Sequence, residues 1–192
     1  MRLLFLDIAT DMGVAEGDPG DAPLLWTVTL GRPGDSFQTR MARATGWAID
    51  KVMKAPPDIC WLEAPVRAGG MTGATTAHTQ AILQGYVAVI MGAFSYRRIP
   101  IEQVGVSKIR KFVIGKGNLK GDRAKAEVDR VCRAEGFRPR NLNESDAWAG
   151  WRWAAAKYKG RPAPRHLWVE PELKLDNEAR EAPRRRRIAG GH

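Results

Sequence analysis

The stretch Arg2-Leu3-Leu4-Phe5-Leu6-Asp7-Ile8-Ala9-Thr10 determines the fold we expect for this chain. Five of the first six residues of the chain are apolar, and a short apolar run of this kind predicts a buried β-strand, here over residues 2–8. Acidic side chains are seldom buried unless they have a partner or a function. Asp7 is therefore the first candidate functional residue, and the rest of the sequence must supply the groups that act with it.

The length of 192 residues is enough for one domain with a substantial core. We predict a folded domain over residues 1–159, followed over residues 160–192 by a basic tail rich in proline and arginine that is irregular or disordered. No run of about 18 apolar residues predicts a membrane span. Asp7 interrupts the apolar N-terminal run, which argues against a signal peptide, so a cytoplasmic protein is expected.

The cysteines and histidines limit the kinds of metal site that are possible. Cys60 and Cys132 lie far apart and lack the spacing of a zinc site, and the chain has only three histidines. Both cysteines have apolar neighbours, so we predict that they are reduced core residues. Any metal ion would have to be held by oxygen ligands.

The charge of the chain indicates its class of partner. The formal net charge is +10, and residues 97–140 contain thirteen Lys or Arg against five Asp or Glu. Residues after Gly160 contain eight basic against five acidic residues. Such a field favours a polyanion, and nucleic acid is the leading partner; a basic protein with no such partner is the alternative.

Hydrophobic periodicity predicts the order of the remaining elements. Further strands are expected at 24–30, 58–65 and 99–104, and helices at 36–54, 74–96, 107–114 and 123–135, with a last helix that opens at 143–146. Residues 11–20 are rich in Gly, Asp and Pro and are predicted to form a turn, and the glycine-rich residues 66–76 a mobile loop. This order predicts an α/β domain with a mixed sheet and helices on its faces.

Two further acids are placed where they could join Asp7. Glu63 closes the apolar strand predicted at 58–65, and Asp146 lies in the opening turn of the last helix. Ligands of α/β sheets gather near strand ends, so the three carboxylates are candidates for one site. The alternatives are a structural role for Asp7 at a turn, an exposed strand-end charge at Glu63, and an acid that favours a helix N-terminus at Asp146.

Four motifs in this order carry a resemblance to a known family. They are Asp7 in an apolar strand, Leu62-Glu63 closing another, the Gly115-Lys116-Gly117-Asn118 turn before a basic helix, and Asn143-Glu144-Ser145-Asp146-Ala147 opening a final helix. Together they make residues 1–157 similar to the RuvC family of Holliday-junction resolvases, particularly its phage-type members. The resemblance implies a ribonuclease-H-like mixed β-sheet flanked by α-helices. It also implies a homodimeric endonuclease of a bacterial or phage-infected cell that nicks four-way DNA junctions with two Mg²⁺ ions, for which Mn²⁺ can substitute.

The resemblance also assigns expected roles to the acids. Asp7, Glu63 and Asp146 match three metal-binding acids of the family. Where a member commonly carries a fourth acid, this chain has Asn143, whose amide oxygen could still bind the metal or orient a water, because it shares a helix face with Asp146. Glu144 is a weaker alternative ligand and is better explained as an acid of the helix cap.

The basic residues are the expected contacts to DNA. Lys125 matches a residue that the family places near the scissile phosphate, where its charge would stabilise the transition state, and Arg110 matches another more loosely. DNA-binding roles are expected for Arg110, Lys111, Lys116, Lys120 and Arg123.

Other functions remain open from the sequence. The same fold could serve an endonuclease for flaps or branched DNA in general. A basic DNA-binding module without catalysis is a second alternative, supported only by Asn143 in place of an acid. A phosphotransferase of the actin-like fold shares an Asp-bearing first strand, but the sequence shows no matching phosphate loops beyond residues 7–13.

Overall fold

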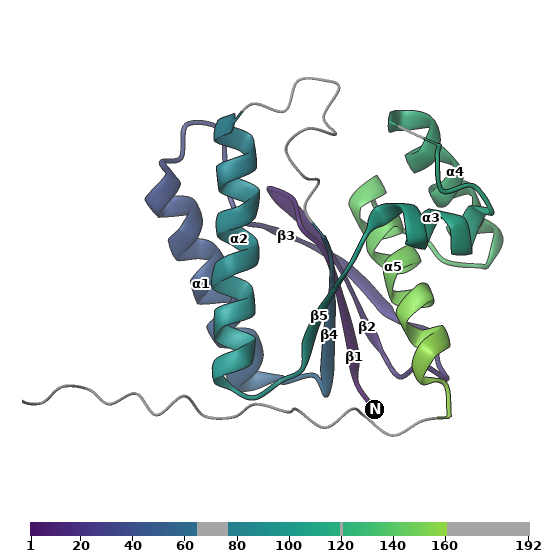
Figure 1. Ribbon diagram of the computed structural model, residues 1–192, viewed down its shortest axis with the longest axis horizontal. Coiled ribbons are helices and arrows are strands. Elements are labelled where there is room, and N and C mark those ends of the chain that lie inside the picture. The colour runs from purple at the N-terminus through teal and green to yellow at the C-terminus, as the bar shows by residue number, and fades with distance from the viewer. Residues whose placement is uncertain (65–76, 120, 161–192) are drawn as a thin grey trace, which may run out of the picture.

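The computed structural model of the chain describes residues 1–64, 77–119 and 121–160. The predicted loop at 66–76, Lys120 and nearly all of the predicted tail lie outside these ranges. A five-stranded sheet in the order β3-β2-β1-β4-β5 forms the centre of the domain (Figure 1). Its strands are β1 (Leu3–Asp7), β2 (Asp11–Gly17), β3 (Leu24–Thr29), β4 (Ile59–Glu63) and β5 (Ile101–Val104).

The sheet is mixed, as predicted. β1, β2 and β3 form an antiparallel meander, whereas β4 is parallel to β1 and β5 is parallel to β4. The parallel strands β1, β4 and β5 therefore end at the same edge of the sheet. This edge carries the last residues of β1 and β4, Asp7 and Glu63.

The prediction of a turn over residues 11–20 was wrong for its first half. Residues Asp11–Gly17 form β2, which pairs with β1 on one side and β3 on the other. The Gly, Asp and Pro content of residues 11–20 suggested a turn, but Gly13 serves a close approach between β2 and a helix that is described below. Only the residues after Gly17 connect the strands as a turn.

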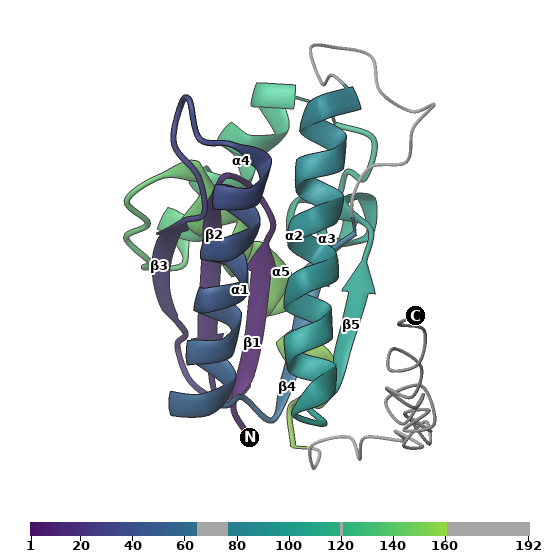
Figure 2. The same cartoon turned by 90° about the vertical axis from the view of Figure 1, so that its left-hand side faces the viewer.

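Helices cover both faces of the sheet. α1 (Phe37–Lys54) and α2 (Ala77–Tyr96) lie on one face, and α3 (Val106–Ile114), α4 (Gly121–Ala134) and α5 (Leu142–Tyr158) lie on the other (Figures 1 and 2). Ser36 caps α1 by accepting a hydrogen bond from the backbone N–H of Thr39. α5 begins at Leu142 with Asn141 as its N-cap, so Asp146 is its fifth residue.

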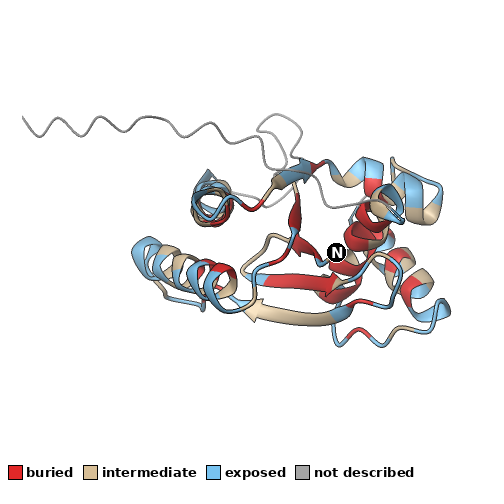
Figure 3. Ribbon diagram, turned by 90° about the horizontal axis from the view of Figure 1, so that it is seen from below, coloured by how far each residue is buried: buried red, intermediate tan, exposed pale blue. Residues whose placement is uncertain are grey.

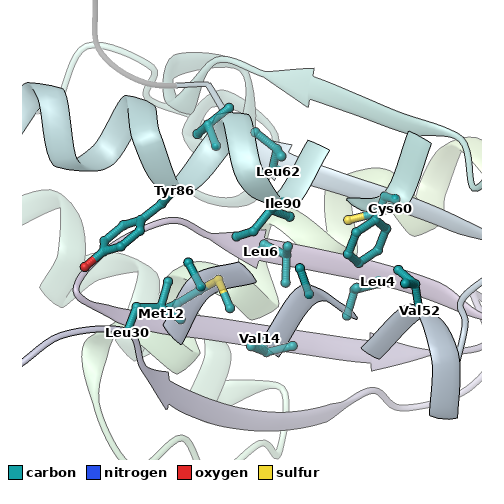
Figure 4. Packing of buried hydrophobic residues seen from close by; sticks show 14 of the residues in the cluster. Leu4, Leu6, Met12, Val14, Leu30, Val52, Cys60, Leu62, Tyr86 and Ile90 are labelled. Carbon is teal, nitrogen blue, oxygen red and sulfur yellow. The ribbon is translucent and has the colours of Figure 1, made fainter. Parts of the chain in front are cut away.

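Each face of the sheet has its own apolar core, because side chains alternate along a strand. Leu4 and Leu6 of β1 pack beneath α1 and α2 with Met12, Tyr86 and Ile90 (Figure 4). Leu3 and Phe5 pack on the opposite face, where α5 contributes buried residues along most of its length (Figure 3).

Trp148 and Trp151 of α5 are buried in the second core. Cys60 is buried in the first core and Cys132 in the second, and both are free, which confirms the prediction that they are reduced core residues. Among the described helices, none is long and apolar enough to cross a membrane.

Candidate active site

The register of the two central strands brings Asp7 and Glu63 together. Leu6 of β1 pairs with Leu62 of β4 in a parallel arrangement, so the next residues, Asp7 and Glu63, are neighbours on adjacent strands. Because Phe5 and Trp61 pack against α5, the alternation of side chains directs both acids to the α5 face. The two carboxylates thus share one face at one edge of the sheet.

Two glycines, which have no side chain, let α5 bring Asp146 to the same place. Gly13 of β2 is the partner of Asp7 in the sheet, and a Cβ atom at Gly13 would lie 2.0 Å from the carbonyl oxygen of Asn143. Further along α5, a Cβ atom at Gly150 would lie 2.0 Å from the ring of Phe5. Only glycine permits such approaches. The first two turns of α5 therefore sit directly on the sheet beside Asp7.

The three acids influence one another strongly. Burial, followed by the nearby charge of Asp146, raises the pKa of Asp7 to about 7. Burial, followed by the charges of Asp7 and Asp146, raises the pKa of Glu63 to about 8. Burial also raises the pKa of Asp146. Buried acids that raise one another's pKa make this cluster a candidate functional site.

Two cations lie beside the cluster. The Nζ atom of Lys125, from α4, is 3.4 Å from Oδ2 of Asp146. Arg110, from α3, donates a hydrogen bond of 3.0 Å to the carbonyl oxygen of Leu119. The charges of both residues lower the pKa of all three acids and so oppose the effect of burial. The structure therefore brings together the two basic residues that the sequence singled out.

Asn143 is held by the sheet. Its Nδ2 donates a hydrogen bond of 2.7 Å to the backbone carbonyl of Asp11, at the start of β2. A carboxylate at this position could not donate that hydrogen bond, which gives a physical reason for the amide where an acid was expected. The amide oxygen of Asn143 is then the atom of this side chain that can accept from a water or bind a cation.

Glu144 has a structural environment. Its Oε1 accepts a hydrogen bond of 3.1 Å from the hydroxyl of Thr27, and its Oε2 accepts one of 2.7 Å from the backbone N–H of Arg140. Its own backbone N–H is capped by Asn141. Both carboxylate oxygens are thus used near the start of α5, which favours the role in the helix cap over that of a ligand.

The other predicted DNA contacts lie at the surface. Lys111 is exposed on α3, Lys116 on the turn that follows α3, and Arg123 on the first turn of α4. Lys111 and Arg123 thus lie on the same helices as Arg110 and Lys125, and Lys116 lies between these helices. Lys120 falls outside the described residues.

The donor set suits a hard divalent cation. Carboxylate and amide oxygens are the ligands that Mg²⁺ prefers, and a cation would relieve the repulsion among the buried acids. Within residues 1–64, 77–119 and 121–160, no three Asp, Glu, His or Cys side chains are close enough to share one ion in the geometry seen here. The carboxylates thus lie in one region at the end of the sheet but are not arranged around a single ion.

The sequence did not point to two pairs of residues that hold α5 in place. Thr27 of β3 accepts a hydrogen bond of 2.8 Å from Asn141, in addition to donating to Glu144. Ser145 of α5 donates a hydrogen bond of 2.5 Å to Asp129 of α4. Asp129 follows Lys125 by four residues and so shares its helix face, and this spacing is visible in the sequence. Nothing in the sequence near Thr27 indicates its contacts with α5.

The mixed five-stranded sheet with helices on both faces is ribonuclease-H-like in fold. Two solved structures of Thermus thermophilus RuvC, the second in complex with Holliday junction substrate, match this chain with TM-scores of 0.64 and 0.63 at 17% and 16% sequence identity. Each match covers 85% of this chain and 99% of the RuvC chain. The yeast mitochondrial Holliday junction resolvase Ydc2 matches with a TM-score of 0.45 at 11% identity, over 81% of this chain and 79% of its own. No protein-family model and no curated protein sequence matches the chain significantly.

Proposed function

We propose that this chain is a metal-dependent endodeoxyribonuclease that nicks four-way DNA junctions. The observation that carries the proposal is the convergence of Asp7, Glu63 and Asp146, from β1, β4 and α5, with Lys125 3.4 Å from Asp146. The likeness in fold to a RuvC structure solved with Holliday junction substrate supports the choice of DNA substrate.

Asp7, Glu63 and Asp146 would hold Mg²⁺, and the amide oxygen of Asn143 would add a neutral donor. Two bound ions would supply an activated water and stabilise the leaving oxygen during phosphodiester hydrolysis. Asp7 is central among the strands and is the proposed shared ligand, because it is the neighbour of Glu63 in the sheet and is influenced by the charge of Asp146. Mn²⁺ is expected to substitute for Mg²⁺.

The two cations act on the phosphate in this proposal. The side chain of Lys125 is 37% exposed, so its ammonium group can reach a phosphate that enters beside the acids. There it would stabilise the negative charge that develops in the transition state. Arg110 adds a second positive charge from α3, while Lys111, Lys116, Lys120 and Arg123 bind the DNA backbone.

Symmetric nicking of a junction requires two such sites, so the proposal includes a homodimer. Apolar side chains that are exposed along the outer side of α1 and α2, namely Ile49, Met53 and Tyr96, support this part. They line a depression of about 440 Å³ together with Val52, Val89 and Ala93. Sedimentation of the wild type and of Met53→Glu measures the oligomeric state. We expect a dimeric wild type and a monomeric Met53→Glu, because the charge disrupts the apolar surface. A monomeric wild type would contradict the dimer.

A cleavage assay on a synthetic four-way junction with Mg²⁺ tests the central proposal. Asp7→Asn is expected to retain junction binding and to lose cleavage, because the amide removes the charge of the proposed shared ligand without changing its size. Undiminished cleavage by Asp7→Asn would refute the proposal. Asp50→Asn, at an exposed ion pair with Lys54 on α1, is the matched control and should cleave as the wild type does.

The alternatives give different results in the same assay. Equal cleavage of junctions, flaps and plain duplex would indicate a broader endonuclease of the same fold. Binding without cleavage of any DNA in Mg²⁺ or Mn²⁺ would indicate a DNA-binding module that lacks catalysis, for which Asn143 in place of an acid is the supporting feature.

A further inference from the structure

We infer that Asp129 and Ser145 are positioning residues that hold Lys125 in place for catalysis. The inference rests on the proposed function and names two residues that act through Lys125 and not on the substrate. Two neighbouring polar contacts join α4 to α5. The first is the ion pair of Lys125 with Asp146 at 3.4 Å, and the second is the hydrogen bond from Ser145 to Asp129 at 2.5 Å.

The positions of these residues on the two helices make the contacts a unit. Lys125 and Asp129 are four residues apart on α4, so their side chains lie on one face, one turn apart. Ser145 and Asp146 are consecutive on α5. A shift or rotation of α4 that broke the contact between Asp129 and Ser145 would therefore also move the ammonium group of Lys125.

The hydrogen bond supplies what the apolar contacts between these helices cannot. Val128 and Cys132 of α4 pack in the core with Trp148 of α5, but apolar contact is non-directional and leaves small rotations nearly free. A hydrogen bond depends on distance and angle, and the hydroxyl of Ser145 is fully buried, so water cannot replace its partner.

Asp129 is itself held at both carboxylate oxygens. Oδ1 accepts from Ser145, and Oδ2 accepts a hydrogen bond of 2.7 Å from Nε of Arg133. The hydrogen bond from Arg133 and, to a smaller extent, that from Ser145 lower the pKa of Asp129, although burial opposes them. This carboxylate is therefore ionised at neutral pH. Arg133 also donates to the carbonyl of Pro139 in the connection to α5.

A double-mutant cycle with Lys125 tests the inference in the full-length protein. Ser145→Ala and Asp129→Asn are each expected to lower the single-turnover rate of junction cleavage by about ten-fold to a hundred-fold, the scale of a displacement of about 1 Å. Junction affinity should stay within about two-fold of wild type, because few phosphate contacts change. In a Lys125→Ala background, each substitution should cost less than about two-fold, since its effect passes through Lys125.

Glu127→Gln is the matched control. Glu127 lies on the same helix and forms an ion pair of 2.7 Å with Arg130 on the exposed side, so its loss should leave cleavage unchanged. Hydrogen exchange of the amides of residues 121–134 should rise in Ser145→Ala and not in Glu127→Gln. Asp129→Asn, at a partly exposed side chain, keeps the test available if the buried substitution unfolds the protein.

The outcomes separate this inference from the function on which it rests. A wild type that cleaves, with equal losses from Ser145→Ala and Asp129→Asn in the presence and absence of Lys125, would overturn the inference alone. Unchanged cleavage in both variants would do the same. A wild type that cleaves no branched DNA would overturn the proposed function and, with it, the inference.

Discussion

Replacing Gly13 by alanine tests the contact that places the site. The new Cβ atom would lie 2.0 Å from the carbonyl oxygen of Asn143, 2.5 Å from its carbonyl carbon and 3.2 Å from Cβ of Ala147. Ordinary contacts begin near 3.4 Å, so the start of α5 would have to withdraw from β2 by about 1.4 Å. The atoms in the way are mainly backbone and cannot rotate aside.

Two opposing effects set the expected loss of stability. Overpacking of this kind costs about 1–3 kcal/mol and sometimes more. Replacing glycine stabilises through the unfolded chain by only about 0.4–1 kcal/mol, so the clash prevails. We expect Gly13→Ala to lower the free energy of unfolding by about 2 kcal/mol and the midpoint of thermal unfolding by about 5 °C. Cleavage of a four-way junction should fall by about a hundred-fold, because Asp146 moves with α5.

Gly46→Ala in α1 is the control for this substitution. A Cβ atom at Gly46 meets nothing within 4 Å, so the higher helix propensity of alanine should stabilise the protein by up to about 1 kcal/mol and leave cleavage unchanged. Thermal unfolding and single-turnover cleavage are measured on both variants. A Gly13→Ala protein that unfolds and cleaves as the wild type does would refute the argument that this contact seats α5 beside Asp7.

Four further predictions concern the acids and their neighbours. The pKa values of Asp7 and Glu63 are raised to about 7 and 8, so near pH 6 the folded state keeps protons that the unfolded chain has released. The free energy of unfolding, measured with a chelator, should therefore fall as the pH rises from about 5 to 8. A stability that rises over this range would contradict the raised pKa values. Cleavage in Mg²⁺ should increase over the same range, because the ionised carboxylates bind the cation, and a rate that is independent of pH in single turnover would contradict their role. Asn143→Asp should lower the free energy of unfolding by about 1–2 kcal/mol, because it replaces the donor to the Asp11 carbonyl by a second acceptor. Asn143→Ser should be at least as stable as Asn143→Asp, and a less stable Asn143→Ser would contradict that cause. Lys125→Met should reduce the cleavage rate by about a hundred-fold at nearly unchanged junction affinity, and a loss confined to affinity would assign Lys125 to DNA binding instead.

Most elements were predictable from local patterns. The helices at 36–54 and 107–114 and the strand that ends at Glu63 lie within one or two residues of their predicted positions. The failure at β2 has a physical cause: Asp11, Gly13 and Gly17 have low strand propensity, and Gly13 is explained by the helix that packs on it. A close approach between distant segments and a turn use the same residues, and a local pattern does not distinguish them.

Some features of the candidate site are likewise visible in the sequence, and others only in the structure. The sequence singled out Asp7 and Glu63 as acids in or at the end of apolar strands, and Asp146 as an acid in the opening turn of the last helix. Lys125 was singled out only by the resemblance to the RuvC family. The sequence could not show that Glu144 caps its own helix, since both of its hydrogen-bond partners depend on the position of Thr27 and the chain before α5.

The sequence by itself determined the α/β class, the basic charge of the chain and the presence of the acids that the proposed chemistry requires, because these follow from composition and from the periods of strands and helices. Only the tertiary structure decided that the acids share one face. The parallel register of β1 and β4 makes Asp7 and Glu63 neighbours, and the absence of side chains at Gly13 and Gly150 lets α5 bring Asp146 to them. Both conditions join residues that are far apart in the chain, and contacts of that range are set by packing and not by local sequence.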